Sequence, residues 1–153
     1  MILYFKKLDE EATVPSRSFD RSIGWDLYAF CLTEQRRPSH ALIPPRTTRA
    51  IKTGIAPMND SGQYYLQICS RSGLAMKSIF VANAPGIIDP DYTGEIVVLL
   101  YNGGHESYYV KHGDRIAQAI PAPVMKVDMR VLPVDYKMPD TPRGAKGFGS
   151  SGR

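Results

Sequence analysis

The sequence predicts an all-β protein, a barrel or sandwich of short strands with at most one short helix. Three observations lead to this prediction. Several short runs alternate apolar and polar residues, turn residues separate these runs, and no stretch is long enough to form an amphipathic helix. A chain of 153 residues fits one domain with a sizeable core of its own.

The predicted elements follow one another along the chain. Residues 1–7 begin apolar and end in two lysines, and we interpret them as a first strand rather than a signal peptide. Residues 64–69 and 125–131 alternate apolar and polar side chains, which predicts two half-buried strands. Residues 72–77 are expected to form one helical turn, and residues 96–101 are apolar throughout, which predicts a strand covered on both faces. The intervening turns are rich in Gly, Pro and Asn: 44–45, 59–62, 102–104 and 112–114.

Two parts are expected: a β domain over residues 1–138 and a flexible C-terminal tail over residues 139–153. The tail contains four glycines and two serines, a composition that does not form a packed element alone. One interpretation is a frayed end, as most termini are. Its one aromatic ring, two hydroxyls and three cations also suit a segment that closes over a phosphorylated ring, so both interpretations stay open at this point.

Composition and charge exclude several classes of protein. No stretch approaches the roughly 18 apolar residues of a membrane span, so no membrane partner is expected. The net charge of +4 comes from interspersed charges and is too weak to specify nucleic acid. Cys31 and Cys69 lack zinc-type spacing and are expected to be reduced thiols of a cytoplasmic protein. Neither a P-loop nor a Ser–His–Asp arrangement is evident, and metal-assisted hydrolysis fits the remaining polar residues better than covalent catalysis.

Five segments carry the candidate chemistry. Residues 24–29 place Asp26 in an apolar strand, where a carboxylate is costly unless it is paired or bound to a cation; alternatively, this Asp ends the strand and faces solvent. Residues 70–75 contain Arg, Ser and Gly, which suit phosphate oxygens, although Arg-Ser-Gly alone is a weak signal. Residues 83–95 are interpreted as a hairpin that presents an Asn amide, a carboxylate and an aromatic ring. Residues 113–118 open a strand whose Gln either pairs inside the core or faces a ligand, and the tail is the fifth segment.

In this order, the five segments closely resemble the five motifs of the trimeric dUTPase family, and the resemblance runs from Gly24 to Gly152. The ordered set, with GIIDPDYTGE in the middle and RGAKGFGSSG at the end, is highly specific. The resemblance implies a jelly-roll-like β-barrel and a homotrimer in which each active site draws on all three subunits. It also implies a Mg2+-dependent hydrolysis of dUTP to dUMP and pyrophosphate, which limits uracil incorporation into DNA and supplies dUMP for dTMP synthesis.

The same resemblance implies roles for individual residues. Asp89 would orient and activate the water that attacks the α-phosphorus, and Tyr92 would pack against the deoxyribose and leave no room for a 2′-hydroxyl. Asn83 would read uracil, Asp26 would hold Mg2+ through its water shell, and Phe148 would stack on the base. The other implied substrate contacts are Arg71, Ser72, Gly73, Gly86, Ile88, Gln118, Arg143, Gly149, Ser150 and Ser151.

Some positions depart from the family pattern, and two rival functions are weighed. Ser70 and Lys146 stand where the family usually has Pro and Gly, and Asp114 is expected either to support the site or to be structural. A dCTP deaminase on the same fold would need a proton-shuttling glutamate where this chain has Leu99, and an aliphatic side chain cannot carry a proton. A regulatory protein that binds a protein partner is not indicated, since no extra domain separates the fourth and fifth motifs.

Overall fold

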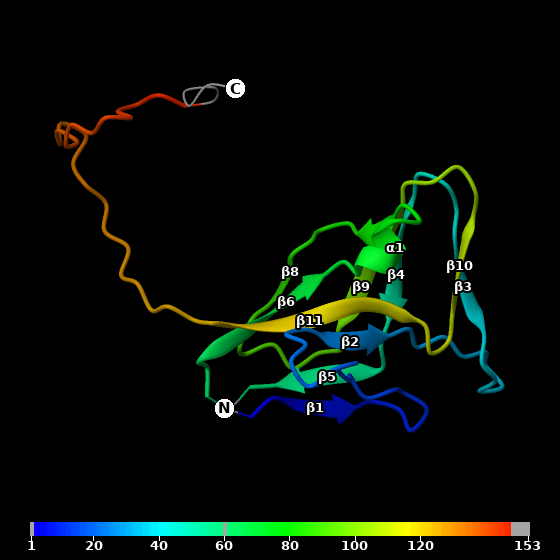
Figure 1. The fold of residues 1–153 in the computed structure, drawn as a ribbon. Coiled ribbons are helices and arrows are strands. Elements are labelled where there is room, and N and C mark those ends of the chain that lie inside the picture. Colours follow the sequence, from blue (N-terminus) through cyan, green and yellow to red (C-terminus); the bar gives the residue numbers. More distant parts are fainter. Residues whose placement is uncertain (1, 60, 148–153) are drawn as a thin grey trace.

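The computed structural model describes residues 2–59 and 61–147, and within them the chain forms short strands and a single helical turn (Figure 1). The predicted all-β class with at most one short helix is confirmed, as are the first strand and the helical turn. No helix in these two ranges is long and apolar enough to cross a bilayer. The elements are β1 (Tyr4–Lys7), β2 (Trp25–Tyr28), β3 (His40–Ile43), β4 (Thr48–Lys52), β5 (Ile55–Met58), β6 (Tyr64–Cys69), α1 (Ser72–Ala75), β7 (Ile79–Val81), β8 (Gly86–Ile88), β9 (Val97–Asn102), β10 (Tyr108–Lys111) and β11 (Arg115–Pro123).

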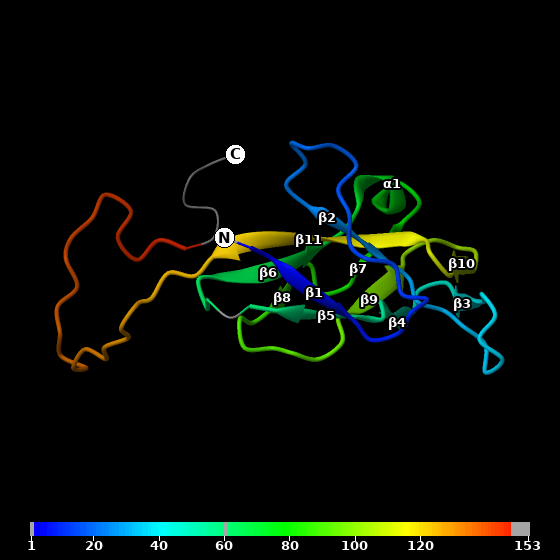
Figure 2. The same cartoon turned by 90° about the horizontal axis from the view of Figure 1, so that it is seen from below.

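The strands pair in antiparallel sheets around one core. The largest sheet has the order β2-β11-β6-β8, a second has the order β4-β9-β7, and β1-β5 and β10-β3 form two-stranded sheets. In Figure 2, β2 and β11 lie on one side of the body and β4 and β5 on the other. In β6, the apolar residues of the predicted alternation point into the core: Tyr64, Leu66 and Ile68 are buried. The largest fully buried side chains include Leu27, Ile43, Ile51, Ile96, Val98, Leu100 and Ile116.

The outer face of the β4-β9-β7 sheet is apolar and open in the single chain. Val98 and Leu100 of β9 are buried, but Val97 and Leu99, which alternate with them, are exposed, as is Phe80 of β7. The prediction that residues 96–101 are covered on both faces is therefore wrong for one chain. The apolar run reflects two apolar faces, of which the chain covers only one by itself.

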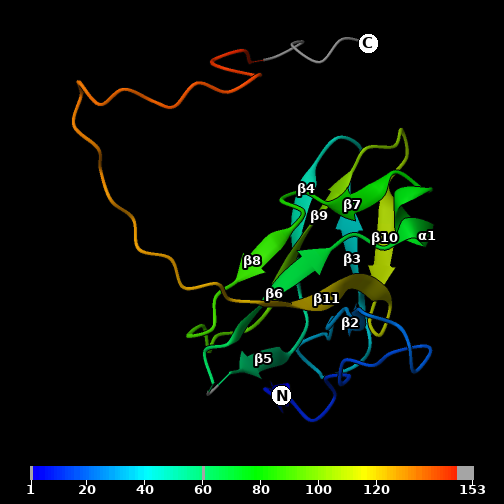
Figure 3. The same ribbon diagram turned by 60° about the vertical axis from the view of Figure 1, so that its left-hand side comes forward.

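The strand predicted at residues 125–131 is also wrong. β11 ends at Pro123, and the chain then leaves the body as an extended segment, which we call the arm (residues 124–138; Figures 1 and 3). In the described part of the chain, no strand pairs with the arm. The alternation is present in the sequence, but a strand also needs a neighbour for its backbone hydrogen bonds. The apolar members of the alternation are between 78% and 91% exposed: Met125, Val127, Met129 and Val131.

Candidate functional site

Three neighbouring strands bring together predicted residues that are far apart in the sequence. On β11, Gln118 lies opposite Asp26 of β2 on one side and opposite Cys69 of β6 on the other. β6 ends at Cys69, and Arg71 follows two positions later. Antiparallel pairing therefore places the first, second and fourth predicted segments side by side on one sheet.

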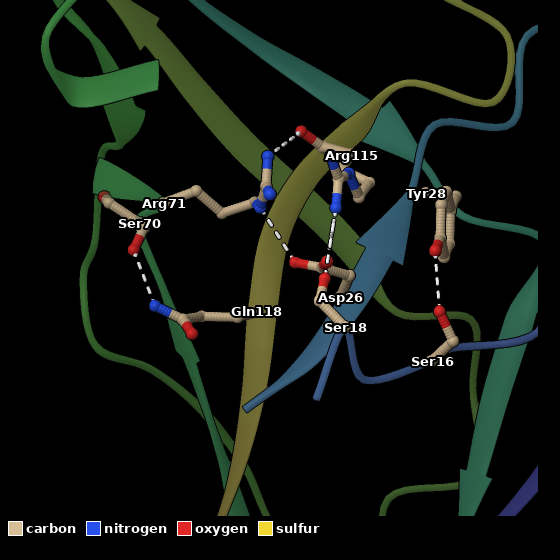
Figure 4. A network of polar contacts seen from close by, with 8 residues as sticks. All are labelled: Ser16, Ser18, Asp26, Tyr28, Ser70, Arg71, Arg115 and Gln118. Atoms are coloured by element: carbon tan, nitrogen blue, oxygen red, sulfur yellow. Dashed lines mark hydrogen bonds and ion pairs between the residues drawn. The ribbon is translucent and has the colours of Figure 1, made fainter. Parts of the chain in front are cut away.

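Asp26 is the centre of an ion-pair network (Figure 4). Its Oδ1 accepts a hydrogen bond from Nε of Arg71 at 2.8 Å, and its Oδ2 accepts one from Nη1 of Arg115 at 3.3 Å. The Asp26 side chain is only 13% exposed, and a carboxylate so enclosed needs cationic partners. The alternative of a strand-end Asp facing solvent is therefore wrong. Two guanidinium groups around one carboxylate leave a net positive charge, which suits an anionic ligand.

Gln118 is fixed on the other side of this network. Its Nε2 donates to the carbonyl oxygen of Ser70 at 3.0 Å. A Cβ atom on Gly24 would lie 2.5 Å from Oε1 of Gln118, so a larger residue at this position would make the Gln118 side chain shift. The hydroxyl of Ser70, where the family usually has Pro, accepts a hydrogen bond from the backbone N–H of Val81 at 2.8 Å. The departure at this position thus supplies a contact that proline lacks.

An open pocket of about 220 Å³ lies over these residues, and we call it the Arg71 pocket. Arg71, Ser72 and Gly73 form one side, and residues 18–24 form another. Sequence reasoning missed the contributions of Ser18, Phe19, Ser22 and Arg115, because no local pattern signals a contact between residues so distant in the chain. The pocket is lined by Ser18, Phe19, Ser22, Gly24, Asp26, Arg71, Ser72, Gly73 and Gln118.

The third predicted segment forms a separate group around β8. Asn83, Asp89 and Tyr92 are exposed there, and Ile88 is half-buried. The Tyr92 backbone N–H donates to the Asp89 carbonyl at 3.1 Å, and its hydroxyl donates to the Glu95 carbonyl at 2.8 Å. These two bonds fix the tyrosine ring within the loop that also carries Asp89. Asp89, Tyr92 and Ile88 also line a shallow groove with residues of β6.

Gly86 allows Asn83 to approach β8 closely. A Cβ atom on Gly86 would lie 3.2 Å from Nδ2 of Asn83 and 3.5 Å from Cβ of Ile68. The amide of Asn83 therefore lies against the backbone of the hairpin.

Asp89, at the far end of the hairpin, is apart from the Arg71 pocket within one chain, whereas Gly86 lies opposite Ile68, one position from Cys69. Ile88 pairs with Leu66 of β6, whereas Gln118 pairs with Cys69. Cys69 lies three positions after Leu66, which is about 10 Å along the strand. Asp89 continues beyond Leu66, and the Arg71 pocket continues beyond Cys69, so the distance between the two groups increases further. One chain therefore presents two partial sites.

The described part of the tail, residues 139–147, lies away from the body (Figure 3). Arg143 is exposed, and its Nε donates to the carbonyl of Lys146 at 3.2 Å. The structure does not bring Arg143 to either partial site. The other predicted contacts of the tail lie outside the described residues: Phe148, Gly149, Ser150 and Ser151.

Asp114 has a structural role in the β10–β11 turn. Its Oδ2 accepts a hydrogen bond from the Lys111 N–H at 2.8 Å, and its carbonyl accepts one from the Ala29 N–H at 2.8 Å. Both cysteines are free. Burial, and secondarily the Asp114 carboxylate, raises the pKa of the Cys31 thiol, which keeps this thiol protonated at neutral pH.

The side chains of the site suit a metal ion that they would hold through its bound waters or through a ligand. Within residues 2–59 and 61–147, no three His, Cys, Asp or Glu side chains cluster in a way that could hold a metal directly. Asp26 is the carboxylate of the Arg71 pocket. Magnesium keeps several of its waters and binds through one or two carboxylates together with phosphates. The pocket therefore fits an ion that arrives with a phosphorylated ligand.

Comparison with known proteins agrees with this geometry. The family model for dUTPase matches residues 10–152. The deoxyuridine 5'-triphosphate nucleotidohydrolase of Nautilia profundicola is 42% identical over 154 residues and covers 100% of both chains. The mitochondrial protein of the same name from Homo sapiens is 40% identical, with 100% of this chain and 56% of that protein covered.

Solved structures show the same fold. A mutant dUTPase of Staphylococcus bacteriophage 80alpha, solved with dUpNHpp, superposes with a TM-score of 0.82 at 24% identity and covers 99% of both chains. A mutant dUTPase of Staphylococcus aureus phage phi11, described with a structural Mg(II) ion, has a TM-score of 0.75 at 19% identity and covers 90% of this chain and 100% of that one.

Proposed function

The chain belongs to the dUTPase family, and we propose that it hydrolyses dUTP to dUMP and pyrophosphate in active sites that a homotrimer completes. The observation that carries this proposal is the Arg71 pocket, in which side chains from three of the predicted segments converge on a site with net positive charge. In the cell, this reaction would keep uracil out of DNA and supply dUMP, and we propose the cytoplasm as its location.

The Arg71 pocket would bind the triphosphate. The Arg71 guanidinium donates to Asp26 through Nε and to the Arg115 carbonyl through Nη1, which leaves Nη2 for phosphate oxygens. The exposed hydroxyl of Ser72 adds a donor, and Gly73 carries no side chain that would fill the space. Gln118 is anchored on Ser70 and forms the floor on which these groups are aligned.

Mg2+ would be held in this pocket by Asp26 through water, together with the phosphates. When bound, the ion would neutralise the negative charge that develops on the phosphate oxygens. Asp26 is held by two guanidinium groups, so its carboxylate is oriented before any ion arrives. The pocket supports this arrangement because it contains one such carboxylate and several donors for the phosphates.

The hairpin group would supply the nucleophile and the selectivity for deoxyuridine. Asp89 is exposed, as a base that must reach a water molecule needs to be. In-line attack of that water on the α-phosphorus would release pyrophosphate. Tyr92, fixed by its hydrogen bond to Glu95, would cover the deoxyribose and exclude a 2′-hydroxyl. Asn83 would bind the uracil edge, and the narrow hairpin would exclude a 5-methyl group.

A trimer would unite the partial sites. The hairpin of one subunit and the Arg71 pocket of another can form one complete site, which explains why one chain holds them apart. Two exposed apolar surfaces support such an assembly: the arm, and the outer face of β9 with Val97 and Leu99. Residues from the tail, with Phe148 over the base and Arg143, Ser150 and Ser151 on the γ-phosphate, would close the site and exclude bulk water.

The rival functions have less support. Leu99 lies on the exposed face of β9, and its side chain has no group that could shuttle a proton in a deamination. A regulatory role through a protein partner has no observation in its favour here, because the likeness to phage proteins at 24% identity concerns the fold.

Product analysis tests the proposal directly. The purified protein is incubated with dUTP, dCTP, dTTP and UTP, each with Mg2+ and with a chelator. We expect dUMP and pyrophosphate from dUTP alone, and only with Mg2+. Ammonia from dCTP would identify a deaminase instead, and absence of any turnover would make the regulatory role the leading one.

A further inference from the structure

We propose that Arg115 is a positioning residue that holds residues 18–23 as the outer wall of the Arg71 pocket and is the second cation bound to the Asp26 carboxylate of the pocket. This inference rests on the proposed function. Arg115 opens β11, and its Nη1 donates to Oγ of Ser18 at 3.2 Å and to Oδ2 of Asp26 at 3.3 Å (Figure 4). One guanidinium thus joins the wall of the pocket to its carboxylate.

Besides this guanidinium, a long hydrogen bond from Nη1 of Arg17 to the Ser22 carbonyl, at 3.4 Å, holds the wall. Its start is anchored, because Ser16 accepts a hydrogen bond from the Asp26 N–H at 2.7 Å and Arg17 stacks over the Trp25 ring at 4.7 Å. Beyond this point the apolar side chains do not enter the core: Phe19 is 78% exposed and Ile23 is 74% exposed. In the described part of the chain, the hydrogen bond between Ser18 and Arg115 is what connects residues 18–23 to β11. Without it, the wall could swing away from the pocket.

The contribution of the Arg115 side chain can be separated from that of Arg71. Nη1 of Arg71 donates to the backbone carbonyl of Arg115 at 3.3 Å, and this contact does not depend on the side chain at position 115. Arg71 also keeps its own bond to Asp26. Replacing Arg115 therefore removes one charge and the bond to the wall, while the other guanidinium keeps its two partners.

The test compares Arg115→Gln, Arg115→Lys and Ser18→Ala with the wild-type trimer. For Arg115→Gln we expect KM for dUTP and the inhibition constant of inorganic triphosphate to rise together by about tenfold, with kcat changed less than KM. Arg115→Lys should recover most of this loss, because an ammonium group can also donate to Ser18 and Asp26. Ser18→Ala keeps the charge and releases only the wall, so it should raise both constants by about threefold.

The control is Arg37→Gln, which removes the same charge from an exposed turn and should change neither constant. A merely structural role would lower the melting temperature and leave the constant for triphosphate unchanged. Wild-type constants in Arg115→Gln, or a fall in kcat alone, would overturn the proposal. If Arg115→Gln does not fold, Ser18→Ala becomes the test. An unchanged KM for dUTP and an unchanged inhibition constant of triphosphate in Ser18→Ala would then overturn the proposal. Absence of dUTP turnover in the wild type, with triphosphate binding still dependent on Arg115, would instead contradict the proposed function.

Discussion

Asp26 and Gln118 lie directly opposite each other on β2 and β11, yet their side chains bind different partners. The Asp26 carboxylate accepts hydrogen bonds from two guanidinium groups, and the Gln118 amide donates to the carbonyl of Ser70. The two side chains therefore fix the loop after β6 at two points, one ionic and one neutral. This double attachment keeps Arg71, Ser72 and Gly73 in place before a ligand binds.

Substitution of Gly24 tests the neutral attachment. In Gly24→Ala, the new methyl group would lie 2.5 Å from Oε1 of Gln118, so we expect the amide to shift and its bond to Ser70 to weaken. We expect kcat/KM for dUTP to fall by about tenfold. Gly73→Ala is the matched variant, because its Cβ meets no atom within 4 Å and occupies the pocket itself. It should keep the wild-type melting temperature and raise KM, and a normal KM would remove Gly73 from the phosphate site.

Substitution of Asp89 tests the proposed base. Asp89→Asn keeps the size of the side chain and loses its ability to accept a proton, so we expect kcat to fall by about a thousandfold. Binding of a non-hydrolysable dUTP analogue, measured by calorimetry, should stay near the wild-type value. Asp91→Asn, two positions along the same exposed loop, is the control and should turn over normally. Turnover within a few-fold of wild type in Asp89→Asn would assign the base to another residue.

The sequence predicted those strands and site residues that a local pattern marks. The alternation in β6 matched its buried and half-exposed faces, and the ordered motifs identified Asp26, Arg71 and Gln118, which the sheet then brought together. The features that the sequence did not predict depend on contacts between residues far apart in the chain. Arg115 and Ser18 are 97 residues apart, and neither has a local signature of their hydrogen bond. The arm has the alternation of a strand, but the pattern does not say which chain provides the neighbouring strand.

Buried Asn102 offers a test of stability away from the site. Its Nδ2 donates to the carbonyls of Ile43 at 2.9 Å and Glu106 at 2.7 Å, and its Oδ1 accepts from the Gly104 N–H at 2.9 Å. Asn102→Ala would leave these three backbone groups without their partner. We expect the free energy of unfolding to fall by about 2–4 kcal/mol. Denaturant unfolding measures this, and a loss well under 1 kcal/mol would mean that water replaces the amide.

The arm should be buried in the proposed trimer. Val127 and Val131 lie on the apolar side of its alternation and are exposed in the single chain. The double variant Val127→Asp, Val131→Asp should shift the trimer towards monomer in sedimentation experiments, because each carboxylate would have to leave water on assembly. Asp128→Asn, on the polar side, should remain trimeric. A stable trimer in the double variant would show that the arm does not contribute to assembly.

Removal of the tail separates closure of the site from folding. The described residues of the tail make hydrogen bonds with one another, such as Arg143 to Lys146, so a chain ending at Pro142 should keep the wild-type melting temperature and trimeric state. Activity should fall by about a hundredfold or more, because the groups expected to stabilise the γ-phosphate and exclude water are gone. Steady-state kinetics and sedimentation of the truncated chain measure both properties. The full-length variant Lys146→Gly, which gives this position the residue usual in the family, should stay active and serves as the control. If the truncated trimer hydrolyses dUTP at the wild-type rate, the tail is only a frayed end, and closure must come from the body of the protein.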